Sequence, residues 1–536
     1  MTSNMVFPKL HWGQFPKELL VEIFNYLPAK DLLSCMSVNN FWNYVGREER
    51  LWKKLFHNEF FWFYSTPKIY DSFREEFLYF KRDMPRKVIF SVEHQGYSWQ
   101  VPVFSNNGKF LIVSGKPASF SVYTTDDFEL IDERCLNYSL GWLSIDSMYF
   151  SPDDSKVLIS GTREGDPGEV AVFSVDDATK RVHFLCRVLS FPKTLGSWFD
   201  NDHILVGEYY EFCFQSPIAS SISQIYLCSL PKHKHDISNF YPFLRFLNQK
   251  CMVLNPLVTS TVSSRFRRVV QIGQQAKQEG KTLAEKLQEL DLHTDGDSGS
   301  TIKELREVLD QEQQCFRCYL KHTLTKEEYG GSTECNCLCH QAYHKMLIYV
   351  TGEFRERICF KLLDHELVND ALTLKRFKLP ESSPKTDEQP EDRWEYIMSR
   401  VDQPDHHIDF GGCVVHIWLS PDQKQLFVIL KTVAGDGDID ANGICNEVRV
   451  IDLDKMIVDP IGCRGTLKPL GSGHVSCGSR LAVSYAENDI NIWSTHHLGL
   501  PVSKLHVDLP ISSVAVHPSG NYLAVTCGCE LRIYDK

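Results

Sequence analysis

Apolar residues near the start of the chain recur at steps of three and four, the spacing of one face of an α-helix. They follow Pro16 as Leu19, Leu20, Ile23, Phe24 and Leu27. Proline suits a first helical turn, because the N–H that it lacks has no partner there. Pro28 ends this helix, and a second begins at Lys30 and Asp31. The pattern predicts a small helical domain over residues 12–56.

These two helices carry more apolar surface than so short a bundle can bury by itself. We therefore expect a partner protein to cover the surplus. The residues that we expect at this contact are Pro16, Leu19, Leu20, Ile23, Leu32, Leu33, Trp42 and Trp52. The alternative is a helical cap that packs on the domain that follows it in the chain.

Residues 57–86 are rich in aromatic side chains at helical spacing, which predicts a helical connector. From residue 87 the pattern changes to short apolar strands separated by turns that contain Pro, Gly, Asn, Asp or Ser. Comparable strand ends fall at Val450, Trp493 and Tyr534, which are 43 and 41 residues apart. Four strands in each unit of about 40 to 45 residues are typical of WD-type propeller blades.

We expect a mostly β fold of about seven blades, with six or eight as alternatives. The blades occupy 87–261 and 344–536, and two of them are expected in 183–230 and in 240–258 joined with 345–363. The chain ends directly after a third strand, which leaves an unpaired edge that propellers normally close. We expect residues 87–93 to supply the missing outer strand.

Residues 262–343 interrupt the strand pattern with a charged, helical and Cys/His-rich insertion. A Cys-x-x-Cys pair lets two thiolates reach one ion, and zinc takes four S or N ligands in a tetrahedron. The candidate ligands are Cys315, Cys318, Cys335, Cys337, Cys339, His340 and His344, of which four would suffice for a structural zinc. The alternative is a cluster of reduced surface cysteines.

Composition excludes several classes of function. The formal net charge is -12, and the one short basic run is residues 265–268, so we expect no nucleic-acid partner. No stretch approaches the roughly 18 apolar residues of a membrane span. The 18 cysteines are scattered through strands, so most should be reduced thiols, and we expect a cytoplasmic protein, with nuclear presence not excluded. The pairs His406–His407 and His496–His497 lack a neighbouring nucleophile turn, so we expect no enzyme activity.

The N-terminal helical domain resembles an F-box, the motif with which substrate receptors hold the Skp adaptor of cullin-RING ubiquitin ligases. Pro16, the Asp31-Leu32-Leu33 step and the Leu51-Trp52 pair fall at its spacing. An F-box followed by a propeller resembles the F-box/WD-repeat receptors. The aromatic connector, residues 407–428 and the large insertion are most similar to the F-box/WD-repeat-containing protein 5 group.

The resemblance implies the substrate-recognition subunit of a Skp–cullin–F-box ubiquitin ligase. Cullin and RING subunits would join through the adaptor, and the propeller would bind a protein substrate. Two alternatives remain at this point, a propeller scaffold outside any ligase and a receptor for a cullin 4 ligase. A Trp-Asp-x-Arg blade ending would favour the latter, and none is intact in the sequence.

Overall fold

The computed structural model describes the chain in segments. These are residues 15–60, 72–94, 98–163, 166–176, 180–190, 196–212, 220–231, 240–249, 257–259, 279–280, 345–352, 355–363, 367–368, 371, 401–420, 423–433, 444–453, 456–458, 463–467, 476–477, 481–486, 488–494 and 502–535. They form two compact units. One comprises the chain up to Glu93 together with the chain from Ser472 on, and the other comprises His94–Gly471. Each unit is considered by itself.

Short helices make up the N-terminal part of the first unit. They are α1 (Lys17–Phe24), α2 (Ala29–Met36), α3 (Asn40–Gly46), α4 (Glu49–Phe60), α5 (Phe73–Leu78) and the π-helix η2 (Tyr79–Asp83). Prolines precede the first two, with Pro16 and Pro28 at the N-cap positions. The Asn39 side chain accepts a hydrogen bond from the Trp42 N–H at 2.8 Å and caps α3. The helical domain thus contains more helices than the two that the pattern predicted.

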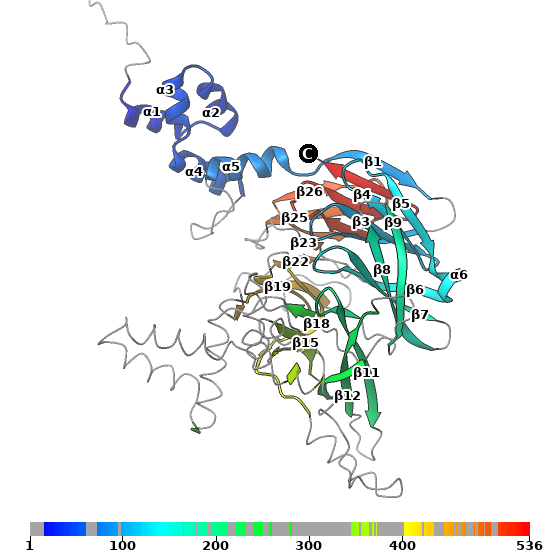
Figure 1. The fold of residues 1–536 in the computed structure, drawn as a ribbon. Coiled ribbons are helices and arrows are strands. Elements are labelled where there is room, and N and C mark those ends of the chain that lie inside the picture. Colours follow the sequence, from blue (N-terminus) through cyan, green and yellow to red (C-terminus); the bar gives the residue numbers. More distant parts are fainter. Residues whose placement is uncertain are drawn as a thin grey trace, which may run out of the picture. The chain divides into compact units, whose positions relative to one another are not determined.

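The strands form seven antiparallel sheets, and the fold is a seven-bladed β-propeller preceded by helices, as predicted (Figure 1). The first two sheets are β2 (Ser98–Phe104), β3 (Phe110–Lys116), β4 (Ser119–Thr124), β5 (Leu130–Cys135), and β6 (Trp142–Phe150), β7 (Lys156–Arg163), β8 (Asp166–Asp176), β9 (Arg181–Leu189). Helix α6 (Leu136–Leu140) joins them. The third sheet is β10 (Ser197–Trp198), β11 (His203–Phe212), β12 (Ser220–Ser229) and β13 (Phe240–Gln249).

The remaining sheets complete the propeller. The fourth is β14 (Leu257–Thr259), β15 (Met346–Thr351), β16 (Arg357–Leu362) and β17 (His406–Asp409); the fifth is β18 (Cys413–Leu419), β19 (Gln425–Val433), β20 (Ile444–Asp452) and β21 (Ile457–Val458), with β22 (Cys463–Leu467) also paired to β20. The sixth is β23 (Ser476–Cys477), β24 (Leu481–Ala486), β25 (Asp489–Ser494) and β26 (Ser503–His506); the last contains β27 (Ser513–Val516), β28 (Leu523–Cys527) and β29 (Glu530–Asp535).

Equivalent blade positions have equivalent structure. The repeat positions that the sequence singled out all lie in the third strand of a blade and are buried: Tyr123, Phe173, Val450, Trp493 and Tyr534. The turn between first and second strands also recurs. A serine hydroxyl accepts the N–H five residues later in three blades, at 2.9 to 3.0 Å, in Ser105–Phe110, Ser151–Lys156 and Ser420–Gln425.

The sequence placed two blade boundaries wrongly. β9 is the outer strand of the second blade rather than part of the next, and β13 pairs with β12 in the third blade rather than opening the fourth. Outer strands alternate apolar and polar residues just as inner ones do, so only the hydrogen-bonded pairing fixes the boundary. The insertion at 262–343 falls between β14 and β15 and, apart from residues 279–280, lies outside the described residues.

The last blade takes its outer strand from the other end of the propeller sequence. β1 (Lys87–Glu93) pairs antiparallel with β29, from Lys87 opposite Asp535 to Glu93 opposite Glu530, in the sheet order β1-β29-β28-β27. Figure 1 shows β1 beside the red C-terminal strand. This is the pairing that the sequence predicted for residues 87–93. The register shifts between Val88 and Phe90, a bulge of the kind that shields strand edges.

Candidate protein-docking site

The N-terminal helices form a folded module with its own apolar core. Its buried members include Leu20, Val21, Phe24, Leu32, Met36, Val45, Leu51, Trp52 and Phe56. The Trp52 indole N–H donates to the Gly46 carbonyl oxygen at 2.6 Å, which satisfies the one polar atom of this buried ring. A Cβ at Gly46 would lie 2.3 Å from Cγ of Met36, so glycine lets α3 approach α2 closely.

Other apolar side chains of the module point to solvent. On α1, Leu19 is 54% exposed and Ile23 is 43% exposed, and the four-residue step places them on one face of the helix. Leu33 on α2 and Val38, just after it, are also exposed. A module that is already packed inside yet presents large apolar side chains outside has the chemistry of a protein-docking surface.

The structure divides the eight predicted contact residues into groups. Pro16, Leu19, Ile23 and Leu33 are exposed and available to a partner, and Trp42 is half-buried with its ring edge-on to Phe24 at 5.6 Å. Leu20, Leu32 and Trp52 are buried within the module, where they belong to its core, and their contact with a partner stays a prediction. Helical periodicity finds both apolar stripes of a helix, but it does not tell the stripe that faces the core from the stripe that faces outward.

Sequence reasoning also missed exposed aromatic residues at the edge of this surface. Tyr26 and Tyr44 are both well exposed, and each carries a lysine ammonium over its ring, Lys54 at 5.5 Å and Lys17 at 4.9 Å. Tyr26 follows Ile23 by three residues, and this spacing was the signal that could have identified it. Such amphipathic rings are frequent at protein interfaces because one part is apolar and the hydroxyl stays wet.

Polar contacts fix the helices that carry the surface. Lys17 forms an ion pair with Glu48 and a hydrogen bond to the Tyr44 hydroxyl at 3.4 Å. These two partners raise the pKa of Lys17, with the hydrogen bond to Glu48 as the larger cause. Lys54 donates to the Asn25 carbonyl oxygen at 3.1 Å, at the C-terminal end of α1 where a cation is favourable. α1 is thereby tied to α3 and α4.

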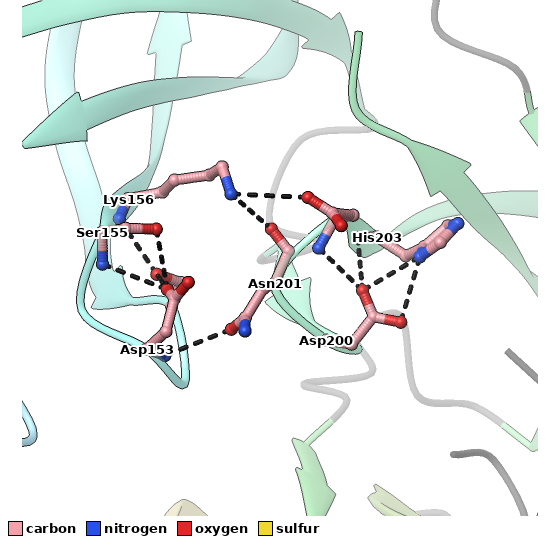
Figure 2. A network of polar contacts seen from close by, with 8 residues as sticks. Asp153, Ser155, Lys156, Asp200, Asn201 and His203 are labelled. Atoms are coloured by element: carbon pink, nitrogen blue, oxygen red, sulfur yellow. Dashed lines mark hydrogen bonds and ion pairs between the residues drawn. The ribbon is translucent and has the colours of Figure 1, made fainter. Parts of the chain in front are cut away.

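In the second unit, polar residues join turns of neighbouring blades (Figure 2). Asn201 accepts from the Asp153 N–H at 3.1 Å, and Lys156 donates to the Asn201 carbonyl oxygen at 2.9 Å. Asp200 accepts from the His203 ring at 2.9 Å. Burial alone would raise the pKa of Asp200, but the hydrogen bond and charge of His203 outweigh it and the pKa is lowered. The bonds from Asp153 and Lys156 to Asn201 run from the second blade to the third, so the network holds these two blades together.

A lysine at the root of the insertion completes this inter-blade belt. Lys345 is buried, donates to the Phe199 carbonyl oxygen and lies 4.4 Å from the centre of the Phe199 ring. Burial lowers its pKa to about 8, against an opposing effect of Asp200. On the other side, Asp154 accepts three N–H groups of Asn106 and Asn107 at 2.7 to 2.8 Å. Four successive blades are thus connected by their turns.

One of the two histidine pairs lies within the described residues. His406 and His407 lie on β17, where Nε2 of His407 is 3.7 Å from Oδ2 of Asp409. Cys359 lies opposite His407 in the ladder, but burial raises the pKa of this thiol to about 12, so it is not an activated thiolate. His496 and His497 lie outside the described residues.

The seven predicted zinc ligands, Cys315 to His344, lie outside the described residues, as does the basic run at 265–268. Among the residues that are described, no three His, Cys, Asp or Glu side chains come together as a metal site. Within the same residues, no helix combines the length and apolarity needed to cross a bilayer. The eight cysteines whose side chains are described are free thiols.

Comparisons with known proteins agree with this division into module and propeller. The family described as F-box-like matches residues 12–58. The F-box protein dre-1 of Caenorhabditis elegans is 40% identical over 48 residues, which cover 9% of this chain and 5% of that protein. F-box/WD repeat-containing protein 5 of Rattus norvegicus is 24% identical in an alignment of 559 residues, covering 97% of this chain and 93% of the rat protein.

Among solved structures, the β-propeller domain of Cps50 (Swd1) from Myceliophteria thermophila matches with a TM-score of 0.42 and 11% identity, covering 84% of this chain and 100% of that one. The predicted resemblance to F-box/WD-repeat proteins is confirmed by the F-box-like match and the full-length relative. The chain combines an F-box-like module with a WD-type propeller, the arrangement of F-box substrate-recognition proteins, which are generally non-catalytic adaptors.

Proposed function

We propose that this chain, an F-box-like module joined to a seven-bladed propeller, is the substrate-recognition subunit of a Skp–cullin–F-box ubiquitin ligase. The observation that carries the proposal is the exposure of Leu19 and Ile23 on α1, inside the F-box-like segment and over an intact core. F-box domains generally bind the Skp adaptor. We place that adaptor on the face formed by Pro16, Leu19, Ile23 and Leu33.

The proposed mechanism is proximity. The module would hold the chain on the adaptor, and cullin and RING subunits would join through it. The propeller would hold a protein substrate near the charged ubiquitin-conjugating enzyme. Confinement raises the local concentration of substrate lysines, and effective concentrations in the millimolar range are usual for tethered partners. In this proposal the bond chemistry takes place on other subunits, and the chain acts in the cytoplasm.

A charge placed on the exposed stripe tests the adaptor contact. In the double variant Leu19→Asp/Ile23→Asp, two carboxylates would have to be desolvated at the interface, which costs several kcal/mol. We expect capture of the purified Skp adaptor to fall at least about 100-fold, the effect of about 3 kcal/mol, while circular dichroism stays unchanged because both positions are already exposed.

Glu18→Gln is the matched control, since Glu18 is an exposed residue of the same helix that points about 100° away from Leu19 and further still from Ile23. It should bind the adaptor like the unmodified chain. Undiminished capture by the folded double variant would reject this interface. Failure of the unmodified chain to bind the adaptor at all would instead favour the propeller scaffold outside the ligase.

We also propose that the Cys/His-rich insertion holds one structural zinc ion through four of its seven candidate ligands. A loop with few core residues gains order from such an ion. Protein purified without chelator should contain about one equivalent of zinc, and Cys315→Ser/Cys318→Ser should lose it. Less than about one tenth of an equivalent in the unmodified protein would reject a structural zinc.

A further inference from the structure

The seam between β1 and β29 is a weakly packed part of the first unit. Every residue of β1 is exposed or half-buried, whereas Leu531, Ile533 and Tyr534 of β29 are buried. β1 therefore adds a backbone ladder to the last blade but little apolar burial. Few apolar contacts of its own therefore hold β1 in place, and its pairing with β29 depends on the elements attached to it.

The helices just before β1 hold its N-terminal end. The Arg86 N–H donates to the Asp535 carbonyl oxygen at 2.7 Å, one residue before the ladder begins. The Tyr79 hydroxyl donates to the Gly520 carbonyl oxygen at 3.3 Å, in the turn between β27 and β28. Met84 is fully buried between these two anchors in the sequence. The position of β1 thus depends on the connector.

The connector in turn packs on the docking module. Phe56 of α4 contacts the rings of Phe73 and Phe80, at centroid distances of 5.7 and 6.1 Å. The Glu49 carboxylate accepts from the Phe73 N–H at 3.2 Å. The buried side chains of α1, α4, α5, η2 and the last two blades belong to one hydrophobic cluster. A continuous packed path therefore leads from the docking helices to the seam.

We infer that the docking module and the seam of the propeller open and close together, so that a partner bound to the module tightens the pairing of β1 with β29. The physical basis is linkage: a ligand that binds only the folded module stabilises every element whose opening requires the module to open. The partner in this inference is the Skp adaptor, so the effect of partner binding on the seam rests on the proposed function. The coupling between module and seam within the chain does not rest on it.

Hydrogen exchange of the full chain, with and without Phe24→Ala, tests the coupling without any partner. Phe24 is a buried residue of the module, remote in sequence from the seam, and removing a buried ring strongly destabilises its surroundings. We expect amides of Lys87–Glu93 and Glu530–Asp535 to exchange at least about tenfold faster. Phe120→Ala, a matched change in the first blade, should leave both segments unchanged and accelerate exchange in its own blade.

The second arm adds purified Skp adaptor at about 100 times its Kd. Exchange in β1 and β29 should slow several-fold, with a ceiling of about 100-fold set by the ratio of bound to free module. Exchange in β5, an outer strand of the other unit, should not change. Normal seam exchange in a destabilised Phe24→Ala protein overturns the coupling. Unchanged seam exchange in a chain that demonstrably binds the adaptor also overturns it, whereas absence of binding together with faster exchange in Phe24→Ala overturns only the proposed function.

Discussion

At the scale of single residues, one backbone position recurs through the propeller with different side chains. The third residue after the start of the turn between first and second strands has a positive φ in four blades, at Gly108, Asp154, Gln423 and Gly520. Glycine adopts this left-handed conformation without strain, whereas an L-residue pays about 1 kcal/mol or more for it. Asp154 uses its side chain to hold Asn106 and Asn107 in the turn of the preceding blade.

Replacement of Asp154 by glycine separates the backbone strain at this position from the inter-blade contact. Asp154→Gly relieves the strain at φ 60° but leaves three N–H groups without their carboxylate acceptor, and should destabilise the protein by about 2 kcal/mol. Thermal melting of the variant and of the unmodified chain measures the difference. A melting temperature that is unchanged or higher in the variant would contradict this account of the turn.

Residue identity alone did not settle which side chains of the docking module face a partner. α1 and α2 are apolar on two sides, and the sequence therefore identified Leu19 and Ile23 correctly as exposed but grouped them with Leu20, Leu32 and Trp52. The helical pattern gives the angle between side chains on one helix. It does not give the direction in which α3 and α4 approach, and that direction decides which stripe is buried.

At the scale of elements, the contact between β1 and β29 combines a ladder with a polar network. The Ser91 hydroxyl donates to Glu530 at 2.5 Å, and Arg532 donates to Glu530 at 2.9 Å through both Nε and Nη2. The hydrogen bond from Arg532 lowers the pKa of Glu530, while burial acts against it. The bond from Ser91 crosses from β1 to β29, while the two bonds from Arg532 lie within β29 and hold the Glu530 carboxylate in place to accept it.

The lowered pKa predicts the pH dependence of this contact. A carboxyl group whose pKa is lower in the folded protein stabilises it above the ordinary pKa, 4.5 for glutamate, and loses that contribution as pH falls through the folded value. Glu530→Gln should cost about 1 to 2 kcal/mol at neutral pH, and the difference from the unmodified protein should shrink below about pH 4. Melting temperatures of both proteins across this range measure it.

Glu129→Gln is the control for this experiment, because the pair of Glu129 with Lys180 is largely exposed, at 60% and 50% of the side chains. Exposed pairs contribute little, so its effect should be small at every pH. A difference between Glu530→Gln and the unmodified protein that stays constant with pH would show that the ion pair is not the source of the stabilisation.

Elements were also where sequence reasoning was least complete. The alternation of apolar residues predicted where strands occur, and the buried third-strand positions such as Tyr123 and Tyr534 gave the length of the repeat. The sequence did not predict which blade each strand belongs to, as β9 and β13 demonstrate, because this depends on pairing between strands with similar patterns. The closing strand was predictable for a different reason: a blade with three strands of its own leaves an edge that another segment must cover.

At the scale of the whole molecule, the two ends of the described chain meet in one unit. The helical module, β1 and the last two blades share a hydrophobic cluster, although more than 370 residues separate Glu93 from Ser472. The part proposed to bind the adaptor and the part that completes the propeller are therefore joined by a few residues, from Tyr79 to Lys87. Unfolding of the helical module should therefore destabilise the pairing of β1 with β29. Local sequence patterns do not reveal this dependence.

Removal of residues 87–93 tests the contribution of closure to the whole fold. Without β1, the backbone groups of β29 that now face it would be exposed, along with the apolar edge of the last blade, so we expect the melting temperature to fall by several degrees or more, as for a loss of a few kcal/mol. The deleted protein should also aggregate more readily, because an open edge pairs with other chains.

Val88→Thr/Ile89→Thr is the control. Both residues are exposed and threonine keeps the strand propensity, so the melting temperature of this variant should stay close to that of the unmodified chain. An unchanged melting temperature after the deletion would mean that the remaining three strands of the last blade suffice, and β1 would then be an accessory strand rather than the closure of the propeller.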